Sequence, residues 1–101
     1  MGLDQSFACP PCTKALYLNS NLIGDEGVQF LAASIACGWL ANLLSFWLQH
    51  NLISDVGAAA LINSIRAASL GLQYLRLDSN DISFEGALAL TTSVLVRRID
   101  V

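Results

Sequence analysis

The residues best suited to chemistry in this chain are its cysteines and a single histidine. The segment C-P-P-C at 9–12 has the C-x-x-C spacing of a redox centre or of half a zinc site. A redox centre needs a helix N-terminus that lowers the thiol pKa, whereas the pattern after Cys12 predicts a strand. A structural zinc site needs four ligands, and only Cys37 and His50 remain as further candidates. We therefore interpret this segment as a turn with incidental thiols, and we expect no metal and no cofactor.

His50 offers no clear route to catalysis. A catalytic histidine needs a nucleophile or carboxylate aimed at it, and no pattern in the sequence identifies one. The chain also lacks a Gly-rich phosphate loop, an H-E-x-x-H zinc motif and a G-x-S-x-G nucleophile motif. We predict a protein that is not an enzyme and has no catalytic residue, with His50 at the rim of a binding face. Cys37 is expected to be a small buried hydrophobic residue.

The elements that must position these residues repeat along the chain. Asn21, Asn51 and Asn80 are 30 and 29 residues apart. Apolar residues spaced by two precede each asparagine, and an isoleucine and then a glycine follow it. A fixed pattern at such a period is typical of a solenoid, in which each unit buries its apolar face only against its neighbours. The glycines that complete the pattern are Gly27, Gly57 and Gly86.

The full pattern, L-x-x-L-x-L-x-x-N-x-I-x-x-x-G followed by a helical run, resembles the leucine-rich repeat. Its length and its glycine are most similar to the ribonuclease-inhibitor-like subfamily, which also forms the repeat regions of NOD-like receptors and Ran GTPase-activating proteins. The resemblance implies an α/β right-handed superhelix, a short horseshoe with a parallel sheet on its concave face and helices on its convex face. It also implies that the asparagine side chains form a ladder between successive turns.

We predict a non-repeat segment at 1–12 and about three repeats at 13–42, 43–71 and 72–101. Short strands are expected at 15–18, 45–48 and 74–77, where residues spaced by two point to one face. A helix follows each strand, with acidic residues at its start, where a carboxylate complements the positive end of the helix dipole. These residues are Asp25, Glu26, Asp55 and Glu85.

The C-terminal residues 93–101 suggest neither a further strand nor a cap. The strand beginning at Tyr74 is therefore expected to be an open sheet edge, and the chain is expected to be a fragment of a longer array. We also expect self-association through the uncapped ends.

Composition limits the partners. The chain has 54% hydrophobic and 13% charged residues and a net charge of −3. Binding to nucleic acid needs clustered Lys and Arg, and only Arg97 and Arg98 are adjacent, so we expect no nucleic-acid partner. No apolar run is long enough to span a membrane, and a cytoplasmic location is expected. The start M-G-x-x-x-S, with Gly2 and Ser6, leaves N-myristoylation open as a minor alternative.

The outward positions of the predicted strands carry the functional hypothesis. Tyr17, Trp47 and Arg76 hold the same place in successive repeats, and aromatic residues and Arg are enriched at interface hot spots. An equally good interpretation is that Tyr17 and Trp47 only cover neighbouring aliphatic atoms. The polar and aromatic residues that flank this row are Asn19, Gln49, Tyr74 and Asp78.

We therefore predict a protein-interaction module that binds a protein partner on its concave face. The first alternative is a sensing or autoinhibitory repeat segment of a signalling protein of the NOD-like receptor type, in which stacking surfaces matter most. A GTPase-activating or enzyme-inhibiting regulator is a further alternative. Fold-level resemblance determines the scaffold better than it determines the ligand.

Overall fold

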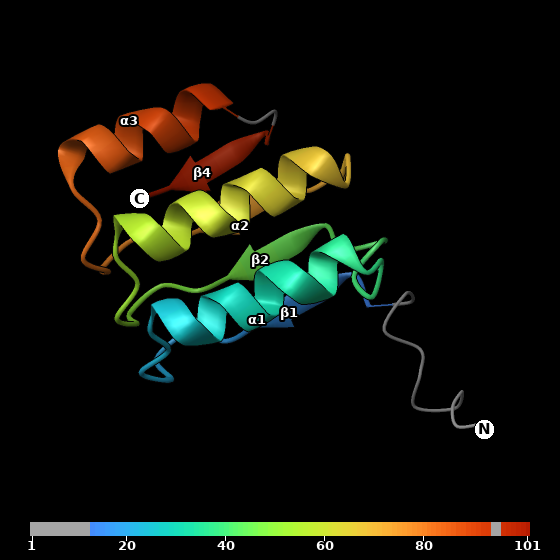
Figure 1. Ribbon diagram of the computed structural model, residues 1–101, viewed down its shortest axis with the longest axis horizontal. Helices are drawn as coiled ribbons and strands as arrows, with labels where there is room; N and C mark the ends of the chain where they lie inside the picture. Colours follow the sequence, from blue (N-terminus) through green and yellow to red (C-terminus); the bar gives the residue numbers. More distant parts are fainter. Residues whose placement is uncertain (1–12, 94–95) are drawn as a thin grey trace.

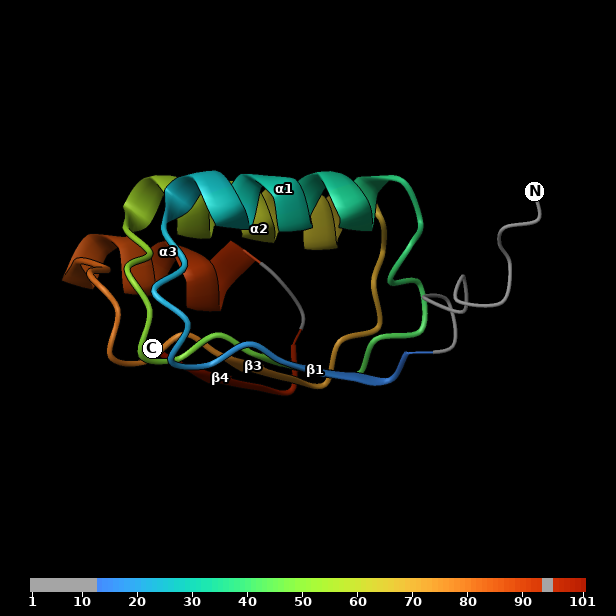
Figure 2. The same ribbon diagram turned by 90° about the horizontal axis from the view of Figure 1, so that it is seen from below.

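The computed structural model describes residues 13–93 and 96–101. Strand and helix alternate along this part of the chain, in the order β1(Ala15–Tyr17), α1(Asp25–Ala36), β2(Ser45–Trp47), α2(Asp55–Ala67), β3(Tyr74–Arg76), α3(Phe84–Ser93) and β4(Arg98–Asp100). The four strands form one parallel sheet in the order β1-β2-β3-β4. All three helices lie on one side of this sheet (Figures 1 and 2), as short parallel strands joined by helical crossovers require.

The core lies between the sheet and the helices. Phe46 and Leu75 are aligned in the sheet, are fully buried and face the helices. Leu61 and Ile65, four residues apart on α2, meet them from the other layer, because residues at this spacing share one face of a helix. Leu90 of α3 is also buried, so each helix contributes to one continuous cluster. The alternation of strand and helix and the two apolar faces confirm the predicted α/β solenoid.

The prediction of an open edge at the third strand is wrong. β4, Arg98–Asp100, pairs with β3 in parallel, and Leu75 is aligned with Ile99. The Arg98 backbone N–H donates to the Gln73 carbonyl at 3.0 Å, and Val96 and Ile99 pack against the core. The free edge of the described sheet is therefore β4. Only three residues pair here, too few for their period-two alternation to stand out in the sequence.

Two other expectations concern the cysteines. Cys37 is exposed, so the prediction of a buried hydrophobic residue is wrong. It lies at the C-terminal cap of α1, where the chain leaves the helix and the core. The C-P-P-C segment and Gly2 lie outside the described residues. Within the described part of the chain, no group of His, Cys, Asp and Glu has the arrangement of a metal site.

Candidate partner-binding face

The face of the sheet that points away from the helices, here called the open face, is covered by no described element (Figure 2). Tyr17, Trp47, Arg76 and Asp100 are aligned in register across the four strands. Their neighbours along each strand point into the core, so these four side chains point to the open face. The predicted row of Tyr17, Trp47 and Arg76 is thus contiguous, and Asp100 extends it by one strand.

The aromatic residues of the row touch one another. The ring centroids of Tyr17 and Trp47 are 4.8 Å apart with an interplanar angle of 69°, and those of Trp47 and Tyr74 are 5.9 Å apart at 74°. Such edge-to-face contacts place the positive edge of one ring on the negative face of the next. Tyr17 is 58% exposed, whereas Trp47 and Tyr74 are half-buried. The open face therefore carries an ordered aromatic ridge.

Arg76 extends this ridge as a held, planar group. Its guanidinium carbon lies 5.3 Å from the Trp47 ring centroid. Nε donates to Asp78 Oδ1 at 3.1 Å and an Nη donates to Asp78 Oδ2 at 2.8 Å, a bidentate pairing that fixes the orientation of the guanidinium. The hydrogen bond to Asp78 raises the pKa of Arg76, so Arg76 stays charged. Part of its charge is balanced by Asp78.

Tyr74 and Asp100 form a second polar pair at the edge of the row. The Tyr74 hydroxyl donates to Asp100 Oδ2 at 2.8 Å, and Arg98 lies over the Tyr74 ring with its guanidinium carbon 4.8 Å from the centroid. This hydrogen bond lowers the pKa of Asp100 and raises that of Tyr74. Two Arg and two Asp thus face one another across β3 and β4. The ridge is nearly neutral at physiological pH.

The remaining predicted contact residues differ in what they can offer a partner. Asn19 is half-buried, and its carbonyl accepts from Asn21 Nδ2 at 3.1 Å. Gln49 is only 5% exposed, so little of its side chain can reach a partner. Among the described residues, Gln49 Oε1 and Trp47 Nε1 are buried polar atoms without a hydrogen-bond partner. Because an unpaired buried polar atom is costly, these two are points of tension beneath the ridge.

The turn asparagines connect successive repeats. Asn51 Oδ1 accepts from the backbone N–H groups of Asn21 and Ile23 at 2.9 Å each, while Nδ2 donates to the carbonyls of Leu18 at 3.0 Å and Leu48 at 2.9 Å. One buried amide therefore serves backbone groups that neither strand nor helix pairs.

Asn80 repeats this arrangement in the next turn. Its Oδ1 accepts from Ile53 N–H at 3.0 Å, and its Nδ2 donates to Leu48 and Leu77. Asn21, in the first described repeat, is exposed and reaches only the Asn19 carbonyl. The ladder thus has two complete rungs.

A second set of contacts between repeats was missed by the sequence interpretation. Asp25 Oδ1 accepts from the backbone N–H groups of Ser54 at 2.8 Å and Gly57 at 3.1 Å, and Oδ2 accepts from the Ser54 hydroxyl. The carboxylate therefore caps the start of α2, the helix that follows its own. These hydrogen bonds, above all the one from the Ser54 hydroxyl, lower the pKa of Asp25.

The same capping contact recurs one repeat later, where Asp55 accepts from Ser83 N–H at 2.8 Å and from the Ser83 hydroxyl. It explains the predicted glycines: a Cβ on Gly57 would lie 2.4 Å from Asp25 Oδ1, and one on Gly86 would lie 2.2 Å from Asp55 Oδ1. Gly27 is different, because a Cβ there would meet Ile23. The recurring S-D-x-G spacing could have revealed this contact.

His50 has a conformational role that accounts for its position. Its backbone φ is 59°, and Ser20 and Ser79, the residues in the same place of the neighbouring repeats, have φ of 60°. This left-handed geometry turns the chain out of the strand just before each asparagine. His50 is exposed, next to the open face.

Comparison with known proteins agrees with this geometry. The family model described as Leucine Rich repeat matches residues 14–32 and 72–90, and each match spans a strand, its asparagine turn and the start of a helix. The chain carries leucine-rich repeats. The residues of the middle repeat have the same turn and the same hydrogen bonds. No curated protein matches the chain significantly. No helix in the described part of this leucine-rich repeat chain has the length and apolarity needed to cross a membrane.

Proposed function

We propose that the open face is a binding surface for a protein partner. The observation that carries this proposal is the ridge of Tyr17, Trp47, Tyr74 and Arg76, which no described element covers. Leucine-rich repeats are in general interaction scaffolds without enzymatic activity. Large aromatic residues and Arg are the types that most often dominate interface energetics.

The arrangement of the ridge favours binding because its groups are already held in place. Trp47 is braced by two aromatic rings, and Arg76 is held by Asp78. Little conformational entropy remains to be lost when a partner covers such side chains. Because the Arg and Asp charges nearly balance, the partner that fits best is an apolar or aromatic surface with few charges. Asn19 and Asp78 lie at the rim, where polar contacts can fix orientation.

The test uses a binding peptide selected against the whole chain from a displayed random library. Trp47→Ala should weaken its binding by about 2 kcal/mol or more, as loss of a hot-spot residue does. Tyr17→Ala should weaken it as well, and this residue is exposed enough for the fold to tolerate the change. Gln29→Ala on the exposed part of α1 is the matched control and should leave binding unchanged. A neutral Trp47→Ala together with a sensitive Gln29→Ala would refute the proposal.

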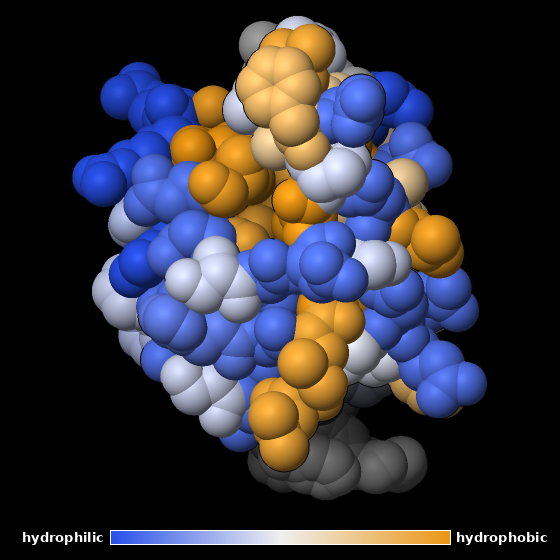
Figure 3. All heavy atoms as spheres, turned by 90° about the vertical axis from the view of Figure 1, so that its left-hand side faces the viewer, coloured by the Kyte–Doolittle hydropathy of each residue, from blue (hydrophilic) through white to orange (hydrophobic). Residues whose placement is uncertain are grey.

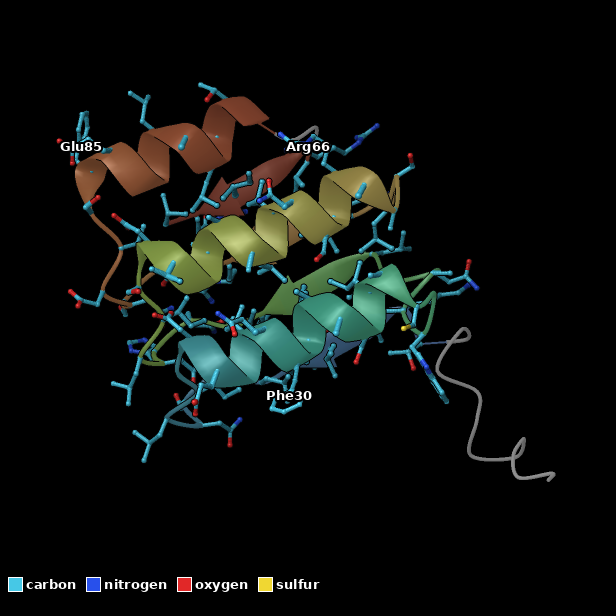
Figure 4. All side chains as sticks on the ribbon, viewed as in Figure 1. Phe30, Arg66 and Glu85 are labelled. Atoms are coloured by element: carbon cyan, nitrogen blue, oxygen red, sulfur yellow. The ribbon has the colours of Figure 1, made fainter. Side chains whose placement is uncertain are left out.

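A second candidate function is stacking through the helix layer, as in a sensing or autoinhibitory repeat segment of a NOD-like receptor. The observation that favours it is Phe30, exposed on the side of α1 that faces away from α2 (Figure 4). The equivalent residues Ala60 and Ala89 are small. An apolar group of this size, unpaired on a lateral helix face, suits contact with another helix. Phe30→Ser should then abolish any concentration-dependent self-association in sedimentation experiments, and Trp47→Ala should not.

Three finer assignments belong to the same proposal. The repeat length of 30 and 29 residues supports membership of the ribonuclease-inhibitor-like subfamily. A cytoplasmic location and the absence of a nucleic-acid partner are proposed from the acidic composition. A regulator that activates a GTPase or inhibits an enzyme would use the same open face, and the Trp47→Ala experiment applies to it unchanged.

A further inference from the structure

The edge of the molecule where strands end and helices begin has a composition of its own. It consists of residues 19–28, 49–58 and 78–87 and is called the loop edge here. These segments contain six of the eight acidic residues of the chain and no Lys or Arg. The opposite edge, where helices end and strands begin, carries Lys14, Arg66 and Arg97. Figure 4 shows Glu85 and Arg66 at opposite ends of the helix layer.

The loop edge also exposes large apolar side chains. Leu22 is 77% and Phe84 is 79% exposed, and Leu52 and Val56 are exposed as well. Figure 3, which looks onto this side of the molecule, shows hydrophobic surface in two groups, with hydrophilic surface between and around them. Leu22 moreover has a φ of 58°, a conformation that leucine rarely adopts, whereas Leu52 in the same place of the next repeat does not have it. A strained and exposed leucine indicates a constraint other than folding.

The acidic residues of the loop edge fall into two groups. Asp25 and Asp55 are engaged with the serines that begin the next helices. Glu26, Asp81 and Glu85 are exposed and lie beside the exposed leucines and Phe84 in sequence and across neighbouring loops. The positive ends of the helix dipoles lie at the same edge and are offset by Asp25 and Asp55. The charge left for a ligand is therefore negative.

The loops that form this edge are held together, so the surface exists before any ligand arrives. The Leu52 N–H donates to the Ile23 carbonyl at 2.8 Å, and the Asp81 N–H donates to the Ile53 carbonyl at 2.8 Å. These contacts place Leu22, Leu52 and Asp81 in successive loops of one paired layer. A surface fixed in this way costs little to order on binding.

A groove begins at this edge. It runs between α2 and α3 with a volume of about 310 Å³, has Asp55 and Glu85 in its first turns, and is lined further in by Ala59, Ile62 and Leu90. Small and aliphatic walls with a carboxylate at the entrance suit an apolar side chain that is followed or preceded by a cation.

We propose that the loop edge is a second docking surface, for a basic amphipathic segment of a protein partner. Leucine-type side chains of that segment would cover Leu22 and Leu52, and its Lys or Arg would face Asp81 and Glu85. Charge complementarity decides the occupant: an anionic membrane or a nucleic acid would be repelled, and a neutral apolar segment would leave the carboxylates unpaired. This surface is separate from the aromatic ridge of the open face and does not depend on it.

The experiment measures binding of fluorescent synthetic peptides to the whole chain by anisotropy at two salt concentrations. One peptide alternates Leu and Lys in the pattern of an amphipathic helix, a second replaces every Leu by Ser, and a third replaces every Lys by Glu. We expect only the Leu/Lys peptide to bind well, with an affinity that falls as salt increases. The double variant Asp81→Asn with Glu85→Gln should weaken binding and reduce its salt dependence.

Variants of the apolar residues complete the test. Leu22→Ser with Leu52→Ser should weaken binding of the Leu/Lys peptide at least about tenfold. The matched control is Leu88→Ser, an exposed leucine of α3 outside the loop edge, which should bind like the unaltered chain. Trp47→Ala should also bind unchanged, so a failure here is distinguishable from a failure of the open-face proposal. Equal binding of the Leu/Lys and Ser/Lys peptides, or equal loss in Leu88→Ser and in the double leucine variant, would overturn the proposal.

Discussion

Two sets of hydrogen bonds join the repeats, and they differ in burial and in direction. Asn51 is buried and reaches back to Asn21 and Ile23 of the preceding repeat. Asp25 is only partly buried and reaches forward to Ser54 and Gly57 of the following repeat. Each junction is therefore held by an amide on the sheet side and a carboxylate on the helix side. The comparison teaches that a solenoid junction combines a contact insensitive to pH with one that depends on charge.

The largest expected effect concerns the buried amide. Asn51→Ala should lower the free energy of unfolding by about 1 to 3 kcal/mol, because it strands buried backbone donors and acceptors. Asn21→Ala is the matched control: its side chain is exposed and bonds only to Asn19, so a change below about 0.5 kcal/mol is expected. Urea denaturation followed by circular dichroism measures both. Equal losses in the two variants would mean that burial is not what distinguishes these asparagines.

The next effect concerns the space that the carboxylate needs. Gly57→Ala places a Cβ against Asp25 Oδ1 and should destabilise the protein by about 1 kcal/mol, although Ala is the better helix former. In an Asp25→Ala background the same substitution should become neutral or stabilising, and this change of sign is the decisive observation.

Gly71→Ala is the control for that experiment, because nothing lies within 4 Å of a Cβ at this position. It should leave the urea midpoint almost unchanged. If Gly57→Ala stabilises the unaltered chain, the carboxylate does not determine the glycine.

The smallest effect is the pH dependence of the second contact. The pKa of Asp25 and of Asp55 is lowered in the folded protein, mainly by the hydrogen bond from a serine hydroxyl. A carboxyl whose folded pKa lies below its unfolded value stabilises the fold above the unfolded pKa, which is about 3.9 for Asp. This stabilisation is lost as the pH falls through the lower, folded pKa.

The urea midpoint measured between pH 7 and pH 2 should therefore fall on acidification, and Asp25→Asn with Asp55→Asn should make that fall shallower. Some dependence should remain, because the pKa of Asp100 is lowered as well by its hydrogen bond from Tyr74. An unchanged pH profile in the double variant would show that these carboxylates contribute no stability through their charge.

Much of the fold was determined by the sequence alone. The apolar residues spaced by two, the asparagines at a period near thirty and the helical runs between them predict strands, turns and helices in the right order, because these signals are local and repeat. The in-register row of Tyr17, Trp47 and Arg76 follows from the same count, since the repeats align residue by residue.

Only the tertiary structure decided which contacts cross from one repeat to the next. The sequence placed Asp25 and Asp55 at helix starts, where they would be expected to serve their own helices, and the structure shows that each caps the helix that follows. It also decided that Arg98–Asp100 forms a fourth strand and that Cys37 is exposed. The physical reason is that periodicity reports which face a residue occupies within its own element, whereas these outcomes depend on the distance and orientation between elements, which no local pattern carries.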